Sequence, residues 1–128
     1  MGIELHERWY HYIMDELLPR LRHFDNETFM VTGCSMGAFH AGNFFFRRPD
    51  IFDSLIALSG LYHSAYGFGS YHDDLTYANS PQDFIPNIPE DHPWLSLYRQ
   101  RNIILCVGQG RWEEELLEST RCMDEILN

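Results

Sequence analysis

Two glycines, Gly33 and Gly37, flank Ser35 at the point where one predicted element of secondary structure meets the next. Before them, residues 28–32 form a short apolar run rich in β-forming side chains, and after them residues 36–48 carry the small and aromatic side chains of a packed helix. A strand that reverses into a helix within a few residues strains its central residue, and side chains two positions away collide there unless they are glycine. The pattern therefore predicts a sharp strand-to-helix turn in which both glycines provide clearance.

Strands and helices continue to alternate along the chain. Residues 55–58 and 102–107 are further short apolar runs, expected to be buried strands, and residues 5–21 and 113–127 have the spacing of amphipathic helices, the first interrupted late by Pro19. Strands that alternate with helices form a parallel sheet with helices on its faces. We therefore expect an α/β fold, a three-layer α/β/α parallel sheet, in one domain over residues 1–128. The side chains expected to be buried on the two helices are Leu5, Trp9, Tyr12, Ile13, Leu17 and Leu21, and Leu116, Leu117, Met123, Ile126 and Leu127.

Charge and composition exclude several classes of partner. The 128 residues include 19 acidic and 9 basic side chains, and the formal net charge of −10 repels phosphate backbones and anionic lipid. We therefore expect no nucleic-acid partner. No apolar run approaches the roughly 20 residues of a membrane helix, and the first residues lack the pattern of a secretory signal. The chain is expected to be soluble and to make no membrane contact.

The cysteines and the remaining motifs bear on location and cofactors. Cys34, Cys106 and Cys122 are widely spaced, an odd number of thiols that is typical of a reducing compartment, so the cytoplasm is the expected location. No His, Cys and Asp residues have the spacing of a zinc site, so we expect no metal and no cofactor. Gly108-x-Gly110 resembles a dinucleotide-binding turn, but Glu113 stands in place of its third glycine, which makes a flavodoxin-like nucleotide binder the weakest reading.

The pentapeptide Gly33-Cys34-Ser35-Met36-Gly37 has the form G-x-S-x-G, which between a strand and a helix is typical of a nucleophile elbow. Such a turn lifts the Ser35 hydroxyl above the carboxyl edge of the sheet, at the N-terminus of the following helix. The backbone N–H of Met36 is then placed to stabilise a developing oxyanion. Ser35 is the candidate nucleophile, and Cys34 is expected to be a packing residue. The alternative is a glycine-rich turn that contains a serine by chance.

Several segments of the chain resemble one family of enzymes. They are similar to stretches of the α/β-hydrolases, in the putative esterase (esterase D-like) family that includes S-formylglutathione hydrolases, enterochelin esterases and mycolyltransferases. The resemblance covers nearly the whole chain, and the elbow is its most specific part. It implies a partial α/β-hydrolase fold and a substrate that is a small ester or thioester. The segments are residues 5–10, 16–19, 33–38, 48–52, 58–60 and 77–81, with Asp83.

The resemblance also implies an acidic residue in the loop after a later strand. The matching loop is residues 107–113, and Glu113 is the candidate acid, which would orient an imidazole and stabilise its charged form. Glu114 and Glu115 are alternatives. All three carboxylates could instead serve only to place negative charge at the N-terminus of the last helix.

In this family the catalytic histidine follows the acid, and none of the seven histidines of the chain lies beyond Glu113. His63 and His72 follow the second predicted strand and could approach Ser35, whereas His40 is expected to point away from it. We therefore expect the chain to be the central piece of a hydrolase domain, without its catalytic base and its first oxyanion loop. The strand edges exposed in such a piece favour homo-oligomers or poor solubility.

Together these observations predict a serine carboxylesterase that forms an acyl-enzyme on Ser35, with weak or no turnover in this chain alone. The alternative is a non-catalytic module that binds a partner or complements a second chain. The aromatic-rich residues 62–77 and the region of Trp94 are expected to line a substrate pocket or to form the core of a lid. The polar, proline-rich residues 80–93 are expected to be a long surface excursion.

Overall fold

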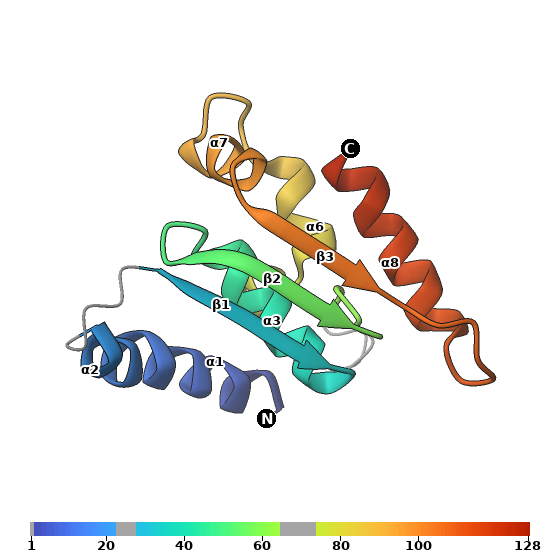
Figure 1. Cartoon of the computed structure of the whole chain (residues 1–128), viewed down its shortest axis with the longest axis horizontal. Helices are drawn as coiled ribbons and strands as arrows, with labels where there is room; N and C mark the ends of the chain where they lie inside the picture. The colour runs from blue at the N-terminus through green and yellow to red at the C-terminus, as the bar shows by residue number, and fades with distance from the viewer. Residues whose placement is uncertain (1, 23–27, 65–73) are drawn as a thin grey trace.

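The computed structural model describes residues 2–22, 28–64 and 74–128, with the elements arranged as in Figure 1. Three strands form the sheet: β1 (Phe29–Cys34), β2 (Phe52–Leu58) and β3 (Asn102–Cys106). Among the described residues, no helix combines the length and the apolar character needed to cross a bilayer. The helical elements are α1 (Gly2–Tyr12), the π-helical η1 (Ile13–Leu17), α2 (Leu18–Arg22), α3 (Met36–Arg47), α5 (Asp74–Ala78), α6 (Pro81–Phe84), the 3₁₀ turn η2 (Ile85–Asn87), α7 (Pro93–Arg99) and α8 (Glu114–Leu127).

The three strands lie side by side in the order β1-β2-β3, and both neighbouring pairs are parallel. Parallel neighbours need a crossover connection, and α3 provides it between β1 and β2. The predicted α/β class is confirmed: a parallel sheet with flanking helices, as part of a three-layer arrangement. β2 begins at Phe52, three residues earlier than the sequence predicts, because as the central strand it pairs on both sides.

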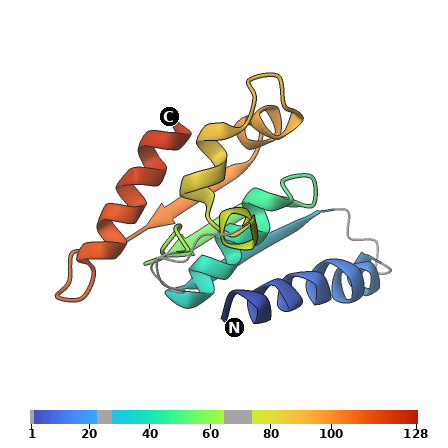
Figure 2. The ribbon, with the colours of Figure 1, turned by 180° about the vertical axis from the view of Figure 1, so that it is seen from behind.

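The core lies between the sheet and the helices, which in the described residues cover one face (Figure 2). α3 occupies the middle of this layer, where its Phe45 and Phe46 are fully buried together with Leu55 and Ala57 of β2. Of the predicted apolar side of α8, Met123 is fully buried and Ile126 and Leu127 pack against the same core, whereas Leu116 and Leu117 are not part of it. This burial fixes α3 against the sheet and so fixes the residue that precedes it, which is Ser35.

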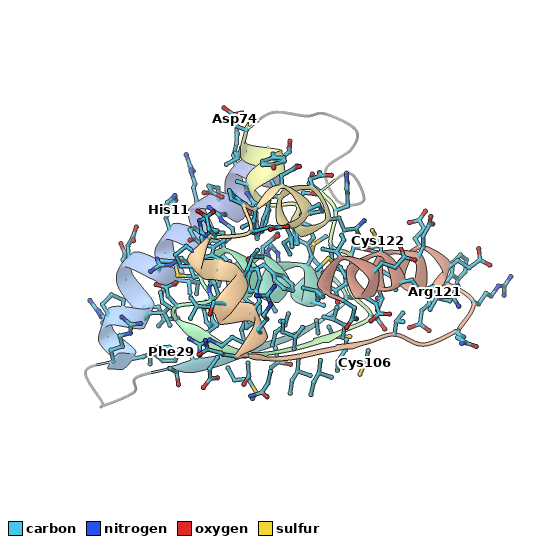
Figure 3. The ribbon with its side chains drawn as sticks, turned by 90° about the horizontal axis from the view of Figure 1, so that it is seen from above. His11, Phe29, Asp74, Cys106, Arg121 and Cys122 are labelled. Carbon is cyan, nitrogen blue, oxygen red and sulfur yellow. The ribbon has the colours of Figure 1, made fainter. Side chains whose placement is uncertain are left out.

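The opposite face of the sheet is open in the described part of the chain, and Figure 3 shows the side chain of Cys106 pointing away from the helices. Met30, Ile104 and Leu58 on the open face are 59%, 49% and 41% exposed. β1 and β3 therefore alternate between core and open face, and the expectation that they are fully buried is wrong because helices cover one side only. The cross-strand rows on this face are Met30, Ser54 and Asn102; Thr32, Ile56 and Ile104; and Cys34, Leu58 and Cys106.

Residues 2–22 form one continuous helical segment, as predicted, but the predicted buried face is wrong. Leu5 and Trp9 are 57% and 51% exposed. The π-helical turn η1 ends at Leu17, two residues before Pro19. In a regular α-helix the ring of Pro19 would meet the carbonyl of Asp15. Here the chain stays helical through the proline. The side chains that are buried are Ile3, His6, Tyr10, Met14 and Leu18.

Polar groups join α1 to α3. His6 Nδ1 contacts His40 Nδ1, and His6 Nε2 lies 3.3 Å from Asn43 Nδ2. The guanidinium of Arg47 donates to both carboxylate oxygens of Glu7, at 2.8 and 2.9 Å. Burial disfavours the Glu7 carboxylate, but the hydrogen bonds from Arg47 and Asn79, together with nearby positive charge, outweigh this and lower its pKa to about 2. His6 can therefore occupy a core position that the hydrophobic pattern assigns to an apolar side chain.

The stretch expected to be a surface excursion is helical over residues 81–87, and Phe84 and Ile85 are buried in the core. Pro81 stands in the first turn of α6, where the absent N–H has no helical partner to lose. Ser80 is buried, and its Oγ accepts the Ser64 N–H at 3.1 Å. Pro81 and Pro93 therefore begin helices, and only residues 88–92, with Pro89 exposed, form the expected surface loop.

The fold should lose stability as the pH falls below about 6.5. Burial, followed by the charges of His40 and Arg47, lowers the pKa of His6 to about 4, so between these two values the unfolded chain binds a proton that the native chain does not. The loss amounts to about 3 kcal/mol at its greatest. The free energy of unfolding, measured with urea across this pH range, should change less with pH in His6→Gln than in wild type. His11→Gln, at the surface of α1, should keep the wild-type pH dependence. The same pH dependence in wild type and His6→Gln would contradict the assignment.

We propose that two copies of the chain associate through the open face. Its exposed side chains Met30, Thr32, Ile104 and Leu58 are uncharged on a chain of net charge −10, so two copies meet there with little repulsion. Ile104→Glu adds a charge to the face without disturbing the core and should shift the chain towards monomer in sedimentation velocity. Ser96→Glu adds the same charge to exposed α7 and should leave the association unchanged. A wild-type chain that stays monomeric at every concentration excludes this association.

Candidate active site

The turn between β1 and α3 places Ser35 at the carboxyl edge of the sheet. Ser35 is exposed, and its φ of 57° and ψ of −117° lie outside the regions that residues with side chains normally occupy. Its N–H donates to the Leu58 carbonyl at 2.9 Å, and its own carbonyl accepts the N–H groups of Ala38 and Phe39 at 3.0 and 3.2 Å. The N–H of Met36 therefore belongs to the first-turn amides for which a helix has no internal acceptor.

The two glycines of the elbow differ in their surroundings. A Cβ on Gly33 would lie 2.2 Å from the Gly37 carbonyl oxygen and 2.8 Å from the Ala38 nitrogen, so no side chain fits there. A Cβ on Gly37 would meet nothing within 4 Å. Clearance is needed at Gly33 but not at Gly37, contrary to the expectation, because the first turn of α3 folds back over Gly33 and leaves the outer side of Gly37 open.

β2 and β3 end at the same edge as the elbow. The register aligns the last residues of the three strands, so Ser35, Ser59 and Val107 follow them at neighbouring positions. Ser59 has a φ of 51°, and its N–H donates to the Cys106 carbonyl at 2.7 Å. In α/β sheets the carboxyl ends of the strands are where ligands bind. Ser59 is not among the predicted site residues, although it lies in a segment that resembles the esterases. Its signal in the sequence is a polar residue followed by Gly60 at the end of a strand.

Glu113 lies in the loop after β3, and three donors hold its carboxylate. Ser59 Oγ donates to Oε1 at 2.8 Å, the Gly108 N–H donates to the same oxygen at 3.1 Å, and the Gly110 N–H donates to Oε2 at 2.9 Å. These bonds, with the one from Ser59 the largest contribution, lower the pKa of the Glu113 carboxyl. The structure thus joins the predicted acid to the end of β2, beside the elbow.

Glu113 differs from Glu114 and Glu115, the other candidates for the acid. Both of those side chains are exposed on the first turn of α8. Glu113 stands at the N-cap of α8 but makes no side-chain bond to the helix amides, because its carboxylate turns back to the loop. Its interactions are therefore specific to the edge of the sheet and go beyond placing negative charge near a helix end.

The candidate bases have partners of their own. His40, on α3, contacts His6 of α1. His63 Nε2 lies 3.1 Å from Asp83 Oδ2. Neither contact involves the elbow, and His72 lies outside the described residues. The described contacts therefore do not join a histidine to the candidate nucleophile.

Cys34 is exposed on the open face of the sheet and is not packed inside the elbow as expected, because the alternation of β1 turns it to the uncovered side. Cys106 is exposed on the same face. Within the described ranges, no three His, Cys, Asp or Glu side chains come together as a possible metal site. The chemical groups gathered at the carboxyl edge are thus two hydroxyls, backbone amides and one carboxylate.

Two hollows bear on where a substrate could lie. A cavity of about 550 Å³ has Tyr77 and Trp94 in its walls but also Arg47, at the last turn of α3. The 12 residues of α3 place that end about 18 Å from Ser35, so the region expected to line a substrate pocket lines a cavity away from the elbow. Residues 65–73, also expected at the pocket, lie outside the described residues. A groove of about 410 Å³ does border the elbow, and it is lined by Gly2, Leu5, His6, Trp9, Met36 and His40.

A family model matches most of the chain. It carries the description Putative esterase and covers residues 3–122. The candidate residues Ser35, Ser59 and Glu113 all lie within the matched range. Neither the comparison with curated proteins nor the comparison with solved structures found a significant match.

The elbow glycines should respond in opposite ways to alanine. Gly33→Ala should lower the free energy of unfolding by about 3 kcal/mol or more, because its Cβ would overlap backbone atoms that cannot move independently. Gly37→Ala, its matched control, should leave stability unchanged or raise it by up to about 1 kcal/mol, since alanine favours the helix and has room. Chemical denaturation of both variants measures the difference. Similar losses in the two variants would show that the elbow differs from the geometry described.

Proposed function

The chain belongs to the putative esterase family, and from this we propose that it carries the nucleophile and the acid of a serine carboxylesterase acting on a small ester or thioester. The single observation that carries the proposal is the strained, exposed backbone of Ser35 between β1 and α3. Non-glycine residues with such torsions are concentrated at functional sites, where the surrounding structure compensates for the strain. The carboxyl edge of the sheet is also the edge at which such enzymes place their reacting groups.

In the proposed reaction, Ser35 Oγ attacks the carbonyl carbon of the ester. A base takes the hydroxyl proton, and the carbonyl oxygen becomes an oxyanion that accepts the N–H of Met36 at the N-terminus of α3. The tetrahedral intermediate collapses to an acyl-enzyme on Ser35 as the alcohol or thiol leaves with a proton. Water then attacks the acyl-enzyme, and the acid and free Ser35 are released.

Glu113 is proposed as the acid that orients the imidazole of the base and stabilises its protonated form. The support is its lowered pKa, which keeps it ionised at neutral pH, and its bond to Ser59 beside the elbow. The contacts described for His40 and His63, with His6 and Asp83, do not include Ser35, so we do not assign the imidazole to either ring. We propose that the base is another histidine, in the same polypeptide or in another. We therefore expect this chain alone to turn over slowly or not at all.

The groove beside Met36 supports an apolar group on the substrate. Leu5, Trp9 and Met36 in its lining are 57%, 51% and 51% exposed, so apolar surface lies next to the proposed oxyanion site. An apolar acyl or alkoxy group placed there would cover this surface. The aromatic ring of Trp9 favours an acyl group of moderate size over a charged one.

The test is covalent labelling with a fluorophosphonate, together with release of p-nitrophenol from p-nitrophenyl acetate. Where the base is present, Ser35→Ala should abolish labelling and lower ester hydrolysis by about a hundredfold or more, because the residue that forms the proposed acyl-enzyme is removed. Cys34→Ala is the matched control, since it removes the neighbouring thiol, which could react with the ester by itself, and it should keep both signals. With the base present, equal rates in wild type and Ser35→Ala end the proposal. A Ser35 that does not label under the same conditions points to the non-catalytic alternative, a partner-binding module.

A further inference from the structure

We propose that Ser59 is a positioning residue for Glu113, which it orients so that carboxylate oxygen Oε2 is the one that receives the imidazole N–H. The inference rests on the proposed function, because it assumes that Glu113 is the acid of the esterase. Ser59 acts through Glu113 and does not touch the reacting atoms. Three features of the described residues support this role: the donors around the carboxylate, the two glycines next to it, and the backbone of Ser59.

The donors are distributed unequally between the two carboxylate oxygens. Oε1 accepts two hydrogen bonds, from the Ser59 hydroxyl at 2.8 Å and from the Gly108 N–H at 3.1 Å. Oε2 accepts one, from the Gly110 N–H at 2.9 Å. Each carboxylate oxygen has two lone pairs, so these bonds saturate Oε1 and leave one acceptor site on Oε2. Without the Ser59 hydroxyl, each oxygen would accept one hydrogen bond from the loop amides.

Two glycines of the loop, Gly108 and Gly110, leave the space that the Glu113 carboxylate occupies. A Cβ on Gly108 would lie 2.4 Å from Glu113 Oε2, and a Cβ on Gly110 would lie 2.8 Å from the same atom. Side chains at either position would therefore displace the carboxylate from the amides. The loop after β3 thus provides both the donors and the space for one carboxylate orientation.

The backbone of Ser59 is strained, and a requirement for its hydroxyl would explain why a serine stands at this position. Its φ of 51° is unfavourable for a residue with a side chain, and among described non-glycine residues it shares a positive φ only with Ser35. The Ser59 N–H donates to the Cys106 carbonyl at 2.7 Å. The next residue, Gly60, packs so closely that a Cβ there would lie 2.7 Å from Tyr62 Oη. The backbone of the turn is therefore constrained at both residues. A glycine at position 59 would adopt this conformation without strain. The serine is consistent with a requirement for its hydroxyl.

The experiment compares two variants that both remove the hydroxyl, Ser59→Ala and Ser59→Gly. Ser59→Gly also relieves the positive φ, so it remains folded even where alanine destabilises the turn. Ser54→Ala is the control: it removes a hydroxyl from β2, the strand that Ser59 follows, where Ser54 Oγ accepts a hydrogen bond from Asn102 Nδ2 at 3.4 Å. Two quantities are measured for each chain: the pKa of the Glu113 carboxyl by ¹³C NMR titration, and the rate of fluorophosphonate labelling at Ser35 as a function of pH.

Both Ser59 variants should raise the pKa of Glu113 towards its ordinary value, since the hydroxyl favours the ionised form. Both should also slow labelling by about tenfold over the pH range in which the base acts, because the carboxylate is then no longer held in one orientation towards the imidazole. Ser54→Ala should match wild type in every measurement.

Two results would overturn the proposal. One is an unchanged Glu113 pKa in both Ser59 variants, which would show that the hydroxyl does not act on the carboxylate. The other is a raised pKa with the labelling rate and pH profile of wild type, which would reduce Ser59 to a brace for the loop. A failure of the esterase function itself is recognised separately, because the wild-type chain then does not label, whereas the NMR titration still reports on the Ser59–Glu113 contact.

Discussion

The close approach of the Gly37 carbonyl to the α-carbon of Gly33 is the constraint from which the site follows. It lets β1 turn into α3 at a single residue, so that Ser35 is strained and exposed at one end of a helix whose Phe45 and Phe46 are fully buried. The burial of that helix against β2 compensates for strain at its first turn, in the way that functional sites generally depend on a stable scaffold. The buried phenylalanines of α3 thus stabilise the fold, while the N-terminal end of the same helix carries the strained, exposed Ser35.

Parallel pairing then gathers at one edge groups that are distant in the sequence. Ser59 and Glu113 are 54 residues apart, yet their side chains are hydrogen-bonded beside the elbow. The two buried or partly buried glutamates are held in different ways. Glu7 is neutralised by the guanidinium of Arg47, whereas Glu113 is held by a hydroxyl and two amides, none of which carries a formal charge. The negative charge of Glu113 therefore remains available to a neighbouring imidazolium, as the proposed acid requires.

Local spacing in the sequence was sufficient to predict the three strands, the first, second and last long helices and the turn at Ser35, because these depend on residues close together in the chain. It did not predict α5, α6 and α7, whose segments were expected to line a pocket or to form a surface excursion. It could not identify the buried face of α1, since His6 is acceptable in the core only because His40 and Asn43 of α3 meet its ring. The difference between Gly33 and Gly37 depends on which atoms fold back over each, and the bond between Ser59 and Glu113 depends on strand register. Both are properties of the assembled sheet and not of any motif.

The open face of the sheet has a consequence for oxidation. Cys34 and Cys106 are aligned with Leu58 from opposite sides, on strands separated by two inter-strand spacings of about 4.8 Å each. A disulfide requires α-carbons within about 7 Å, so these two thiols cannot bridge within one chain. A disulfide at this face can therefore form only between different molecules. A dimer cross-linked through these thiols would show that the two molecules were in contact through their open faces.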